Sequence, residues 1–353
     1  MKAAVLQAHG EPLSIEEVED PSVDPDGAVV EIEACGICRS DWHAWQGHWG
    51  WMGLEAHPGQ ILGHEPAGRV VEIGEEVERI AEGDHVAIPF NLGDGTCSEC
   101  RRGYSNTCES PTPLGFVPFA QGAFAEYTHV PAAEHNLVRL PEGVSSTEMA
   151  GMGCRFVTAF RALAHRAEVN AGDWVAIHGC GGVGLSAVHV ADALGANVVA
   201  IDVDPDTLER AGDLGAVETI DANEVGDVAS AVRARTDGGA HVSMDALGIA
   251  ATCRNSVESL RNRGRHVQVG LTTDEEEGEI ALPTDRIVSK EIEFLGSLGM
   301  PPIRYDEIFR MVDTGTLRPA DVVSETVALE DVSAYLEAMT DYGTSGIPVI
   351  TKF

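Results

Sequence analysis

The stretch that decides the fold is Trp174–Asp202, WVAIHGCGGVGLSAVHVADALGANVVAID. Its first five residues are apolar and partly β-branched, so they predict a strand. Apolar side chains then recur at helical spacing from Leu185 to Leu194, and Gly195 is placed to end that helix. Because Asn197–Ile201 is a second apolar run, the stretch predicts a strand–helix–strand unit.

The turn between the first strand and the helix has the form G-x-G-x-x-G, with Gly179, Gly181 and Gly184. Glycines at these places allow a tight turn, close approach of the backbone to a pyrophosphate, and close packing of helix on strand. Asp202 ends the second strand, where its carboxylate can accept hydrogen bonds from a ribose diol. The stretch therefore predicts a dinucleotide-binding site.

The carboxylate of Asp202 also bears on the choice of cofactor. It would repel a 2′-phosphate, and the following residues, Val203–Asp206, bring no cation. NAD(H) is therefore favoured over NADP(H). NADP(H) stays open as an alternative if a distant arginine or a bound cation meets the 2′-phosphate.

Alternating strand and helix patterns follow this unit. Apolar strands at 217–220, 241–246, 265–271 and 291–299 alternate with helical patterns, among them 250–262. Six strands separated by helices predict an α/β fold with a doubly wound parallel sheet. The first part of the chain is rich in short strands and in glycine or proline turns, up to a strand expected over 135–141, so it predicts a β-rich domain.

Composition limits the class of protein. The chain has 353 residues, enough for two domains, and 57 acidic against 23 basic residues give a net charge of −34. The acidic residues are scattered rather than gathered in a tail, which predicts a halophilic protein, because salt screens their mutual repulsion. The charge argues against nucleic acid and anionic membranes as partners. No apolar run could span a bilayer and the first residues lack a signal-peptide core, so we expect a cytoplasmic protein.

The eight cysteines have spacings typical of metal sites rather than of a secreted disulfide framework. The pair Cys35-x-x-Cys38 alone could be a redox pair or half of a zinc site. Further along, His64 and Glu65 add an imidazole and a carboxylate to the same domain. Because Zn²⁺ takes thiolate, imidazole and carboxylate ligands, this combination favours a zinc site.

A second group has the spacing Asp94-x2-Cys97-x2-Cys100-x7-Cys108, in a loop rich in glycine, serine and arginine. Four ligands at this spacing predict a closed structural zinc site. Asp94 either ligates the zinc through an oxygen, which we favour, or is an ordinary turn aspartate in a degenerate site. A metal analysis that found a single zinc per chain would contradict the first interpretation.

Taken together, these motifs resemble those of the zinc-dependent medium-chain alcohol dehydrogenases. The segments CGICRSDWH (35–43), GHE (63–65), the group at 94–108, GCRFVTAF (153–160) and GCGGVGLS (179–186) occur in that family's order and spacing. The resemblance covers essentially the whole chain and implies a GroES-like catalytic domain combined with a Rossmann domain. We expect a zinc-binding catalytic domain over 1–155, a dinucleotide-binding domain over 156–298, and a C-terminal segment, 299–353, that returns to the catalytic domain. Relatives imply a homotetramer or a homodimer.

The resemblance also implies a role for each matching residue. The catalytic zinc ligands are implied to be Cys38, His64 and Cys154, and the structural zinc ligands Asp94, Cys97, Cys100 and Cys108, with Asp94 at the family's usual first cysteine. The residues implied in catalysis are Ser40 and His43 as a proton relay, Asp41 as the acid that orients the ligand histidine, and Glu65 as a carboxylate that can approach the metal. The residues implied in cofactor binding are Arg39 at the pyrophosphate, Thr158 and Val183 at the nicotinamide, and Gly179, Gly181, Gly182, Gly184, Asp202 and Val269. His43 could instead be a surface histidine, and Glu65 could be only a buried acid near the metal.

The implied activity is reversible hydride transfer between a zinc-bound small primary or secondary alcohol and NAD(H), with an aldehyde or ketone as the other product. Zinc with an open fourth position makes a bound oxygen more acidic. Polyol or sugar dehydrogenases use the same scaffold, and a zinc-free relative could bind a dinucleotide without catalysis. Each tryptophan of the next stretch is individually more typical of packing than of a substrate contact: Trp42, Trp45, Trp49 and Trp51. One or two of them could still narrow the pocket, and Phe90 and Phe116 are further candidates. This aromatic-rich loop favours simple primary alcohols.

Overall fold

The sheet that contains the opening stretch is parallel throughout. The computed structural model describes residues 1–273, 275–341, 343–344 and 346–353, and the chain divides into two units, Met1–Val157 with Gly299–Phe353 and Thr158–Leu298. In the second unit six strands lie in the order β12-β11-β10-β13-β14-β15, and each neighbouring pair is parallel. Their bounds are β10 (Trp174–His178), β11 (Asn197–Asp202), β12 (Ala216–Asp221), β13 (Ala240–Asp245), β14 (Leu260–Gln268) and β15 (Glu293–Gly296).

The order of strands reverses between β10 and β13, so the predicted doubly wound parallel sheet is confirmed. Ligands of open α/β sheets bind outside the carboxyl ends of the strands at such a switch point. Gly179 follows β10 directly and Asp202 ends the neighbouring strand β11. The sheet therefore brings the predicted glycine turn and the predicted ribose acid to the same edge.

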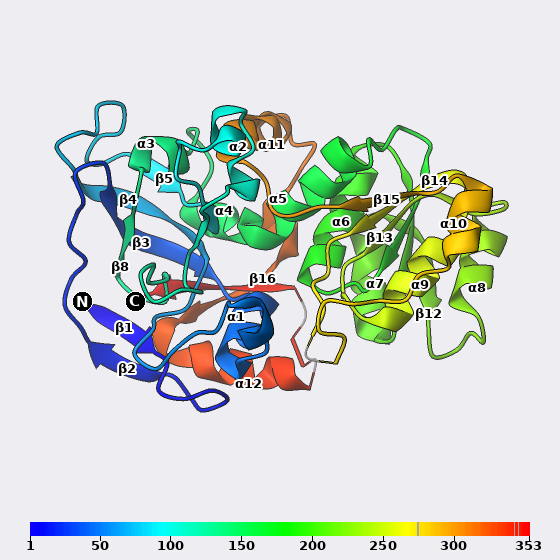
Figure 1. Cartoon of the computed structure of the whole chain (residues 1–353), viewed down its shortest axis with the longest axis horizontal. Helices are drawn as coiled ribbons and strands as arrows, with labels where there is room; N and C mark the ends of the chain where they lie inside the picture. The colour runs from blue at the N-terminus through cyan, green and yellow to red at the C-terminus, as the bar shows by residue number, and fades with distance from the viewer. Residues whose placement is uncertain (274, 342, 345) are drawn as a thin grey trace. The chain divides into compact units, whose positions relative to one another are not determined.

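Helices connect these strands and flank the sheet (Figure 1). They are α6 (Gly182–Ala193), α7 (Pro205–Asp213), α8 (Val228–Arg235), α9 (Ala250–Glu258) and α10 (Thr284–Lys290). α7 begins with a proline after Asp204, whose side chain accepts a hydrogen bond from the Asp206 N–H at 3.2 Å. A buried core that includes Val199, Val232 and Val257 packs helices against strands.

Two local expectations are wrong, and tertiary contacts explain both. The helix expected over 250–262 ends at Glu258, because Leu260 begins β14, pairs with Ala240 and is buried in the core. The strand expected over 135–141 is reduced to β9 (Val138–Arg139) after the short helix α3 (Ala133–Asn136). The buried Asn136 side chain accepts a hydrogen bond from the Gly93 N–H at 2.9 Å and donates to the carbonyl oxygens of Gly93 and Pro131, which fixes this turn.

The first unit is built around a mixed seven-stranded sheet. Its strands run in the order β16-β17-β3-β4-β5-β9, and β8 also pairs with β3. The bounds are β3 (Ala28–Gly36), β4 (Glu65–Ile73), β5 (His85–Ala87), β8 (Tyr127–Val130), β16 (Val323–Ala328) and β17 (Ile347–Lys352). The small sheets pair β1 (Lys2–Val5) with β2 (Ser14–Glu17), and β6 (Asn91–Leu92) with β7 (Thr112–Pro113).

The C-terminal residues join the sheet formed by the N-terminal part of the chain. β17 lies beside β3, where Val349 pairs with Gly36 and Ile350 with Cys35 (Figure 1). Besides α3, the α-helices described in this unit are α1 (Arg39–Gln46), α2 (Ser98–Arg101), α4 (Ser146–Met152), α11 (Tyr305–Asp313) and α12 (Val332–Thr340), and α5 (Cys154–Phe160) begins in it. Because β3 ends just before Cys38 and β4 begins just after His64, the sheet brings two predicted metal ligands together.

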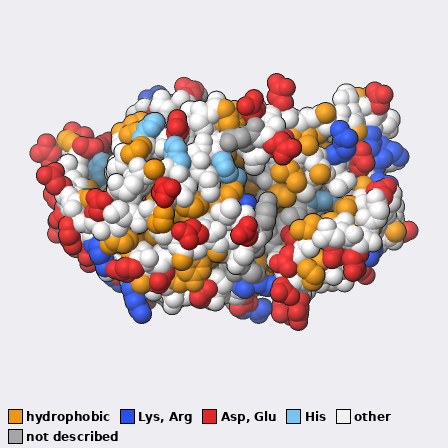
Figure 2. All heavy atoms as spheres, turned by 90° about the horizontal axis from the view of Figure 1, so that it is seen from below, with side chains coloured by type: hydrophobic (Ala, Val, Ile, Leu, Met, Phe, Trp, Pro, Cys, Tyr) orange, Lys and Arg blue, Asp and Glu red, His pale blue; other side chains and the backbone are white. Residues whose placement is uncertain are grey.

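Acidic side chains are spread over the surface. Figure 2 shows them scattered across the face it draws rather than gathered in one patch. This agrees with the dispersed excess of 57 acidic over 23 basic residues. Among the described helices, none combines the length and the apolar character that crossing a membrane requires.

Candidate functional site

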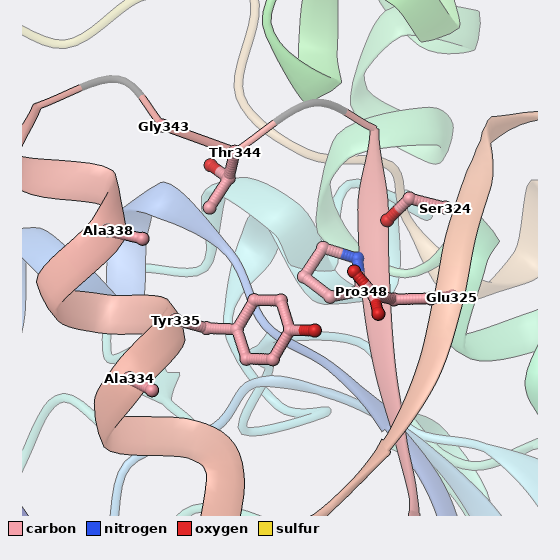
Figure 3. Close-up of a pocket in the computed structure, with 8 residues that line it drawn as sticks. All are labelled: Ser324, Glu325, Ala334, Tyr335, Ala338, Gly343, Thr344 and Pro348. Atoms are coloured by element: carbon pink, nitrogen blue, oxygen red, sulfur yellow. The ribbon is translucent and has the colours of Figure 1, made fainter.

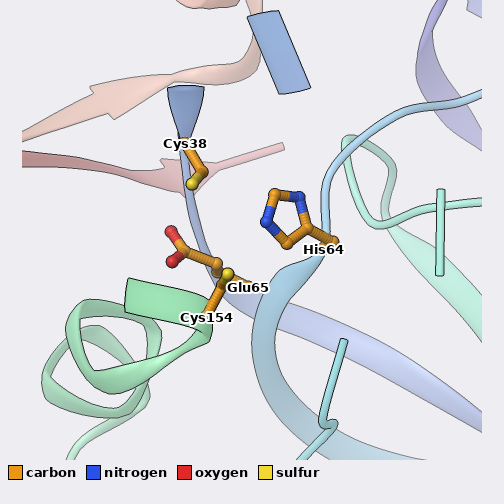
Figure 4. A group of neighbouring side chains, drawn as sticks. All are labelled: Cys38, His64, Glu65 and Cys154. Atoms are coloured by element: carbon orange, nitrogen blue, oxygen red, sulfur yellow. The ribbon is translucent and has the colours of Figure 1, made fainter. Parts of the chain in front are cut away.

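Four side chains from separate segments converge in the first unit. Cys38, His64, Glu65 and Cys154 each offer one ligand atom, and these atoms all lie within 4.8 Å of one another (Figure 4). Cys38 precedes α1, Glu65 begins β4, and Cys154 begins α5. The structure thus brings together the three predicted zinc ligands and the predicted nearby acid.

Asp41 holds the segments that carry Cys38 and His64. One carboxylate oxygen accepts a hydrogen bond from the Cys38 N–H at 2.9 Å. The other accepts from the Gly63 N–H at 3.1 Å and bonds Nδ1 of His64 at 2.7 Å. Because Asp41 is 1% exposed, water does not compete for these bonds. This contact leaves Nε2 of His64 as the ring nitrogen that faces the sulfurs.

The donor atoms of this cluster are suited to binding a cation. Nε2 of His64 is buried and has no hydrogen-bond partner among the residues that the structure describes. The hydrogen bond from Cys154 and the charge of Arg155 hold the pKa of Cys38 well below its usual value. The hydrogen bond to Cys38 and burial raise the pKa of Cys154. A divalent ion that takes two thiolates and one imidazole fits this set of donor atoms.

Arg155 is a site residue that motif reasoning missed. Its backbone N–H and its Nε each donate to Oε1 of Glu65 at 3.1 Å, and its Nη2 donates to Oε2. Both side chains are buried, with exposed fractions of 4% for Arg155 and 0% for Glu65. Burial raises the pKa of Glu65 although Arg155 opposes the change. The only signal in the sequence is an arginine directly after Cys154 in an otherwise apolar helical run.

The predicted relay residues lie on α1. Ser40 is its second residue, and His43 lies one turn further along on the same face. Burial lowers the pKa of His43 to about 3, so its ring is neutral at neutral pH. Nδ1 of His43 lies 3.1 Å from Nδ1 of His48, which makes His48 a second histidine at this place. His43 is half-buried, and its ring contacts a histidine that the motif did not predict.

Arg39, the predicted pyrophosphate contact, is the first residue of α1. Its Nη1 donates to the Met339 carbonyl oxygen at 2.8 Å, and its guanidinium lies 4.2 Å from the centre of the Trp42 ring. These contacts fix the guanidinium within the first unit.

Aromatic rings surround His64 and His43. The ring centre of Phe116 lies 4.9 Å from that of His64, and Phe90 lies 6.0 Å from it. Trp49 stacks on His43 at 4.8 Å and lies 5.9 Å from Phe116. Trp51, in contrast, is 42% exposed. Of the candidate pocket tryptophans, Trp49 is therefore the better placed.

A separate pocket of about 320 Å³ lies between α12, β16 and β17 (Figure 3). It is lined by Ser324, Glu325, Ala334, Tyr335, Ala338, Gly343, Thr344 and Pro348. None of these lining residues was predicted for the site, so the pocket does not change the assignment.

The second predicted metal group also converges. Asp94, Cys97, Cys100 and Cys108 each bring one ligand atom within 4.8 Å of the others. The sulfurs of Cys97 and Cys108 are 3.8 Å apart. Backbone N–H groups of Asp94 and Ser110 donate to the Cys108 sulfur at 3.4 and 3.3 Å, which fixes the position of this sulfur in the loop.

Asp94 is also an ordered turn residue. One of its oxygens accepts hydrogen bonds from the N–H groups of Thr96 at 2.7 Å and Cys97 at 2.9 Å. These bonds lower the pKa of Asp94 to about 2. A carboxylate oxygen of Asp94 also lies within 4.8 Å of the three sulfurs, so the turn and the ligand interpretations are compatible.

The predicted nucleotide residues lie in the second unit. Gly179 has a φ of +85°, in the region that favours glycine. A Cβ at Gly184 would overlap the Gly179 carbonyl oxygen, so this glycine is required for the helix to pack on the turn. A Cβ at Gly181 would meet no described atom within 4 Å, so packing does not explain that glycine. This open space at the N-terminus of α6 is compatible with close approach of a ligand.

Asp202 is fixed by the backbone around it. Its Oδ2 accepts from the Cys180 N–H at 2.6 Å, and its Oδ1 accepts from Val203 and Asp204 at 2.7 and 3.1 Å. A carboxylate has about four acceptor positions, so one remains for a ribose hydroxyl. The motif predicts only the ribose contact of Asp202. The structure adds its hydrogen bond to the glycine turn at Cys180.

The remaining predicted cofactor residues are placed as follows. Gly182 and Val183 form the first turn of α6, and Val269 follows β14. The Thr158 hydroxyl is buried, and no hydrogen-bond partner for it occurs in the described part of the chain. A bound polar group could satisfy this hydroxyl.

Comparisons with known proteins agree with this geometry. Residues 24–142 match the model described as alcohol dehydrogenase GroES-like domain, and residues 182–314 match the model described as zinc-binding dehydrogenase. An alcohol dehydrogenase of Rhizobium meliloti is 36% identical over 84% of this chain and 84% of its own length. A NAD-dependent alcohol dehydrogenase of Sulfurisphaera tokodaii is 32% identical over 99% of both chains. The solved structure of an alcohol dehydrogenase from Thermus sp. ATN1 matches 100% of both chains with a TM-score of 0.91 at 32% identity.

Proposed function

Because the chain belongs to the zinc-binding alcohol dehydrogenase family, we propose that it transfers hydride reversibly between a small primary or secondary alcohol and NAD(H). The observation that carries this proposal is the convergence of Cys38, His64 and Cys154, with Asp41 bonded to the histidine. A non-catalytic dinucleotide-binding protein would have no use for this constellation. The aldehyde or ketone is the other product.

Cys38, His64 and Cys154 would hold a catalytic Zn²⁺. When bound, the ion supplies Lewis acidity, which lowers the pKa of an oxygen ligand by several units. Asp41 fixes the Nδ1–H tautomer of His64 and so directs Nε2 towards the ion. Phe90 and Phe116 beside the histidine exclude water, which strengthens electrostatic interactions in the site.

Ser40 and His43 would carry the proton between the alcohol and solvent. The hydroxyl of Ser40 can both accept and donate a proton. The neutral His43 ring presents one nitrogen without a proton, which can accept one in turn. Its Nδ1 contact with His48 holds the ring in place.

The second metal group would hold a structural Zn²⁺ through Cys97, Cys100, Cys108 and Asp94. Its donor set is closed, because all four positions are taken by the protein. We therefore expect two zinc ions per chain.

One assay tests both the proposed activity and its dependence on salt concentration. NADH absorbance is followed while a panel of alcohols is offered with NAD⁺ or NADP⁺, at low salt and in molar KCl. We expect alcohol-dependent reduction of NAD⁺ that is strongest in molar salt, because a net charge of −34 opposes folding when it is not screened. No reduction with any alcohol in zinc-loaded protein would contradict the enzyme, and highest activity without salt would contradict the halophilic character.

Replacing Asp202 by alanine tests the choice of cofactor. We expect the KM for NAD⁺ to rise about 10- to 100-fold, since a hydrogen bond to a charged group contributes about 1.5–3 kcal/mol. The preference for NAD⁺ over NADP⁺ should fall, because the negative charge is removed. Asp206→Ala, at a nearby exposed acid, is the control and should leave both KM values unchanged. Equal KM values for Asp202→Ala and the unmodified protein would refute this role.

Replacing Trp49 by leucine tests the substrate pocket. The ratio of kcat/KM for hexanol to that for ethanol should rise roughly tenfold or more, since each accommodated methylene is worth about 1–3 kcal/mol. Trp51→Leu is the matched control, because Trp51 is exposed, and it should leave the ratio unchanged. A Trp49 variant with an unchanged ratio would place this side chain outside the pocket.

We also propose that the chain assembles as a homodimer or homotetramer in the cytoplasm. β15 is an edge strand of the parallel sheet, and its Phe294 is 41% exposed. A second copy that paired along this edge would satisfy its outer backbone groups. Light scattering in molar KCl measures the mass; a monomer would contradict the proposal.

A further inference from the structure

The metal cluster contains one donor more than a catalytic zinc site uses. Cys38, His64, Glu65 and Cys154 all offer ligand atoms within 4.8 Å of one another. Four protein ligands close a tetrahedral zinc site, whereas catalytic sites have three and keep one position for substrate. Some feature of the protein must therefore keep one of the four donors away from the ion.

Arg155 supplies that feature. It engages both oxygens of Glu65 through its backbone N–H, Nε and Nη2. For Glu65 to coordinate an ion, it would have to give up these bonds and leave a guanidinium that is 4% exposed without its partner. An unpaired charge at such a position is strongly unfavourable. In the described part of the chain, Nε2 of His64 has no hydrogen-bond partner that would compete with an ion in this way.

Two positions beside this ion pair have room for it only because they are glycines. A Cβ at Gly36 would overlap Oε2 of Glu65 and lie 3.2 Å from Nη2 of Arg155. A Cβ at Gly153 would lie 2.5 Å from Cβ of Glu65 and 2.8 Å from its Cγ. Gly36 does not have a positive φ, so space rather than backbone conformation requires glycine there. The protein has thus made room for the carboxylate at the place where it meets the arginine.

We propose that Arg155 is a positioning residue that holds Glu65 out of metal coordination, so that Cys38, His64 and Cys154 alone bind the ion. The inference rests on the proposed function for the presence of a metal. Arg155 follows Cys154 directly in the chain. The backbone therefore links Cys154, a proposed ligand, to Arg155, which restrains Glu65. Arg155 acts through Glu65 and does not itself contact substrate.

Cobalt substitution tests the proposal without an activity assay. Full-length protein is loaded with Co²⁺, and its visible absorption is recorded while imidazole is added as a small external ligand. In the unmodified protein, imidazole should enter the free position and shift the spectrum. In Arg155→Met, we expect a changed spectrum before any addition, and an apparent affinity for imidazole at least tenfold weaker, because Glu65 occupies that position.

Three further variants separate positioning from structural damage. The double variant Arg155→Met/Glu65→Gln should recover the original spectrum and imidazole response, because the competing carboxylate is gone. Arg155→Lys, which keeps a cation, should stay close to the unmodified protein. Gly36→Ala displaces the carboxylate without changing any charge, and should show the same changed spectrum and weaker imidazole binding as we expect for Arg155→Met. It takes the place of Arg155→Met if that variant does not fold.

The outcomes are distinguishable. An Arg155→Met protein, or failing that a Gly36→Ala protein, with the unmodified spectrum and imidazole affinity would overturn the proposal, as would a double variant that does not recover. The four-residue cluster and the group at 94–108 each contribute to the cobalt–thiolate absorption. The absorption that Cys38→Ser loses, relative to the unmodified protein, identifies the share of the four-residue cluster. If that share is absent, the metal assignment of the proposed function fails, and this inference fails with it.

Discussion

Cys154→Ser is expected to lower kcat/KM for alcohol oxidation about a thousandfold or more. A serine hydroxyl stays protonated near neutral pH, so the cluster would retain one thiolate and one imidazole, too few to hold the ion. The metal contributes several kcal/mol to the transition state, and each 1.36 kcal/mol changes the rate tenfold. Zinc content should fall from two ions per chain to one, as measured by plasma emission spectrometry on the same preparation used for kinetics.

Cys35→Ser is the matched control for this variant. Cys35 is a buried thiol three residues before Cys38, and it lies outside the group of four converging ligands. Both zinc ions and most of the activity should remain. A Cys154 variant that keeps both ions, or a Cys35 variant that loses one, would contradict the ligand assignment.

Cys100→Ser is expected to lower the melting temperature by about 10 °C or more. Cys100 is 5% exposed, and its sulfur belongs to the group that joins residues 94, 97 and 108. Structural zinc binding contributes about 10–16 kcal/mol in small domains, and even a third of that amount shifts the midpoint of a large domain by this much. Differential scanning calorimetry in molar KCl, combined with zinc analysis, measures both effects.

Cys253→Ser provides the comparison. This thiol is 1% exposed in α9 and lies outside both converging groups, so the substitution tests burial without metal loss. A shift of a few degrees, in line with about 1 kcal/mol, is expected. Equal melting temperatures for the Cys100 and Cys253 variants would argue against a structural zinc.

Local patterns were sufficient to predict the nucleotide-binding sheet. The glycine turn, the helix after it and the position of Asp202 all lie within one strand–helix–strand unit, so their signals need no distant contact. The errors at 135–141 and 250–262 arose where distant contacts outweigh local preference. Asn136 bonds Gly93, and Leu260 pairs with Ala240.

The metal cluster could be predicted only through motifs. Cys38, His64 and Cys154 lie far apart in the sequence, and no spacing rule places their ligand atoms within 4.8 Å. The pairing of Arg155 with Glu65 was missed because neither residue carries a local signal for the other. The bond between His43 and His48 was missed because it depends on how the chain turns after α1 at Gly47, where φ is +76°.

The hydrogen bonds of Asp41 have a consequence for how the two proposed ions exchange. Residues 38, 63 and 64 are tied to one carboxylate by the protein itself, so their arrangement does not depend on a metal. In the group at 94–108, the sulfurs are contacted by amides of their own loop, and the ion would be what joins them. A chelator should therefore remove the ion at Cys38, His64 and Cys154 reversibly and leave a folded apoprotein that binds zinc again. Removal of the ion at 94–108 should instead unfold its loop, so that adding zinc back does not readily restore this site.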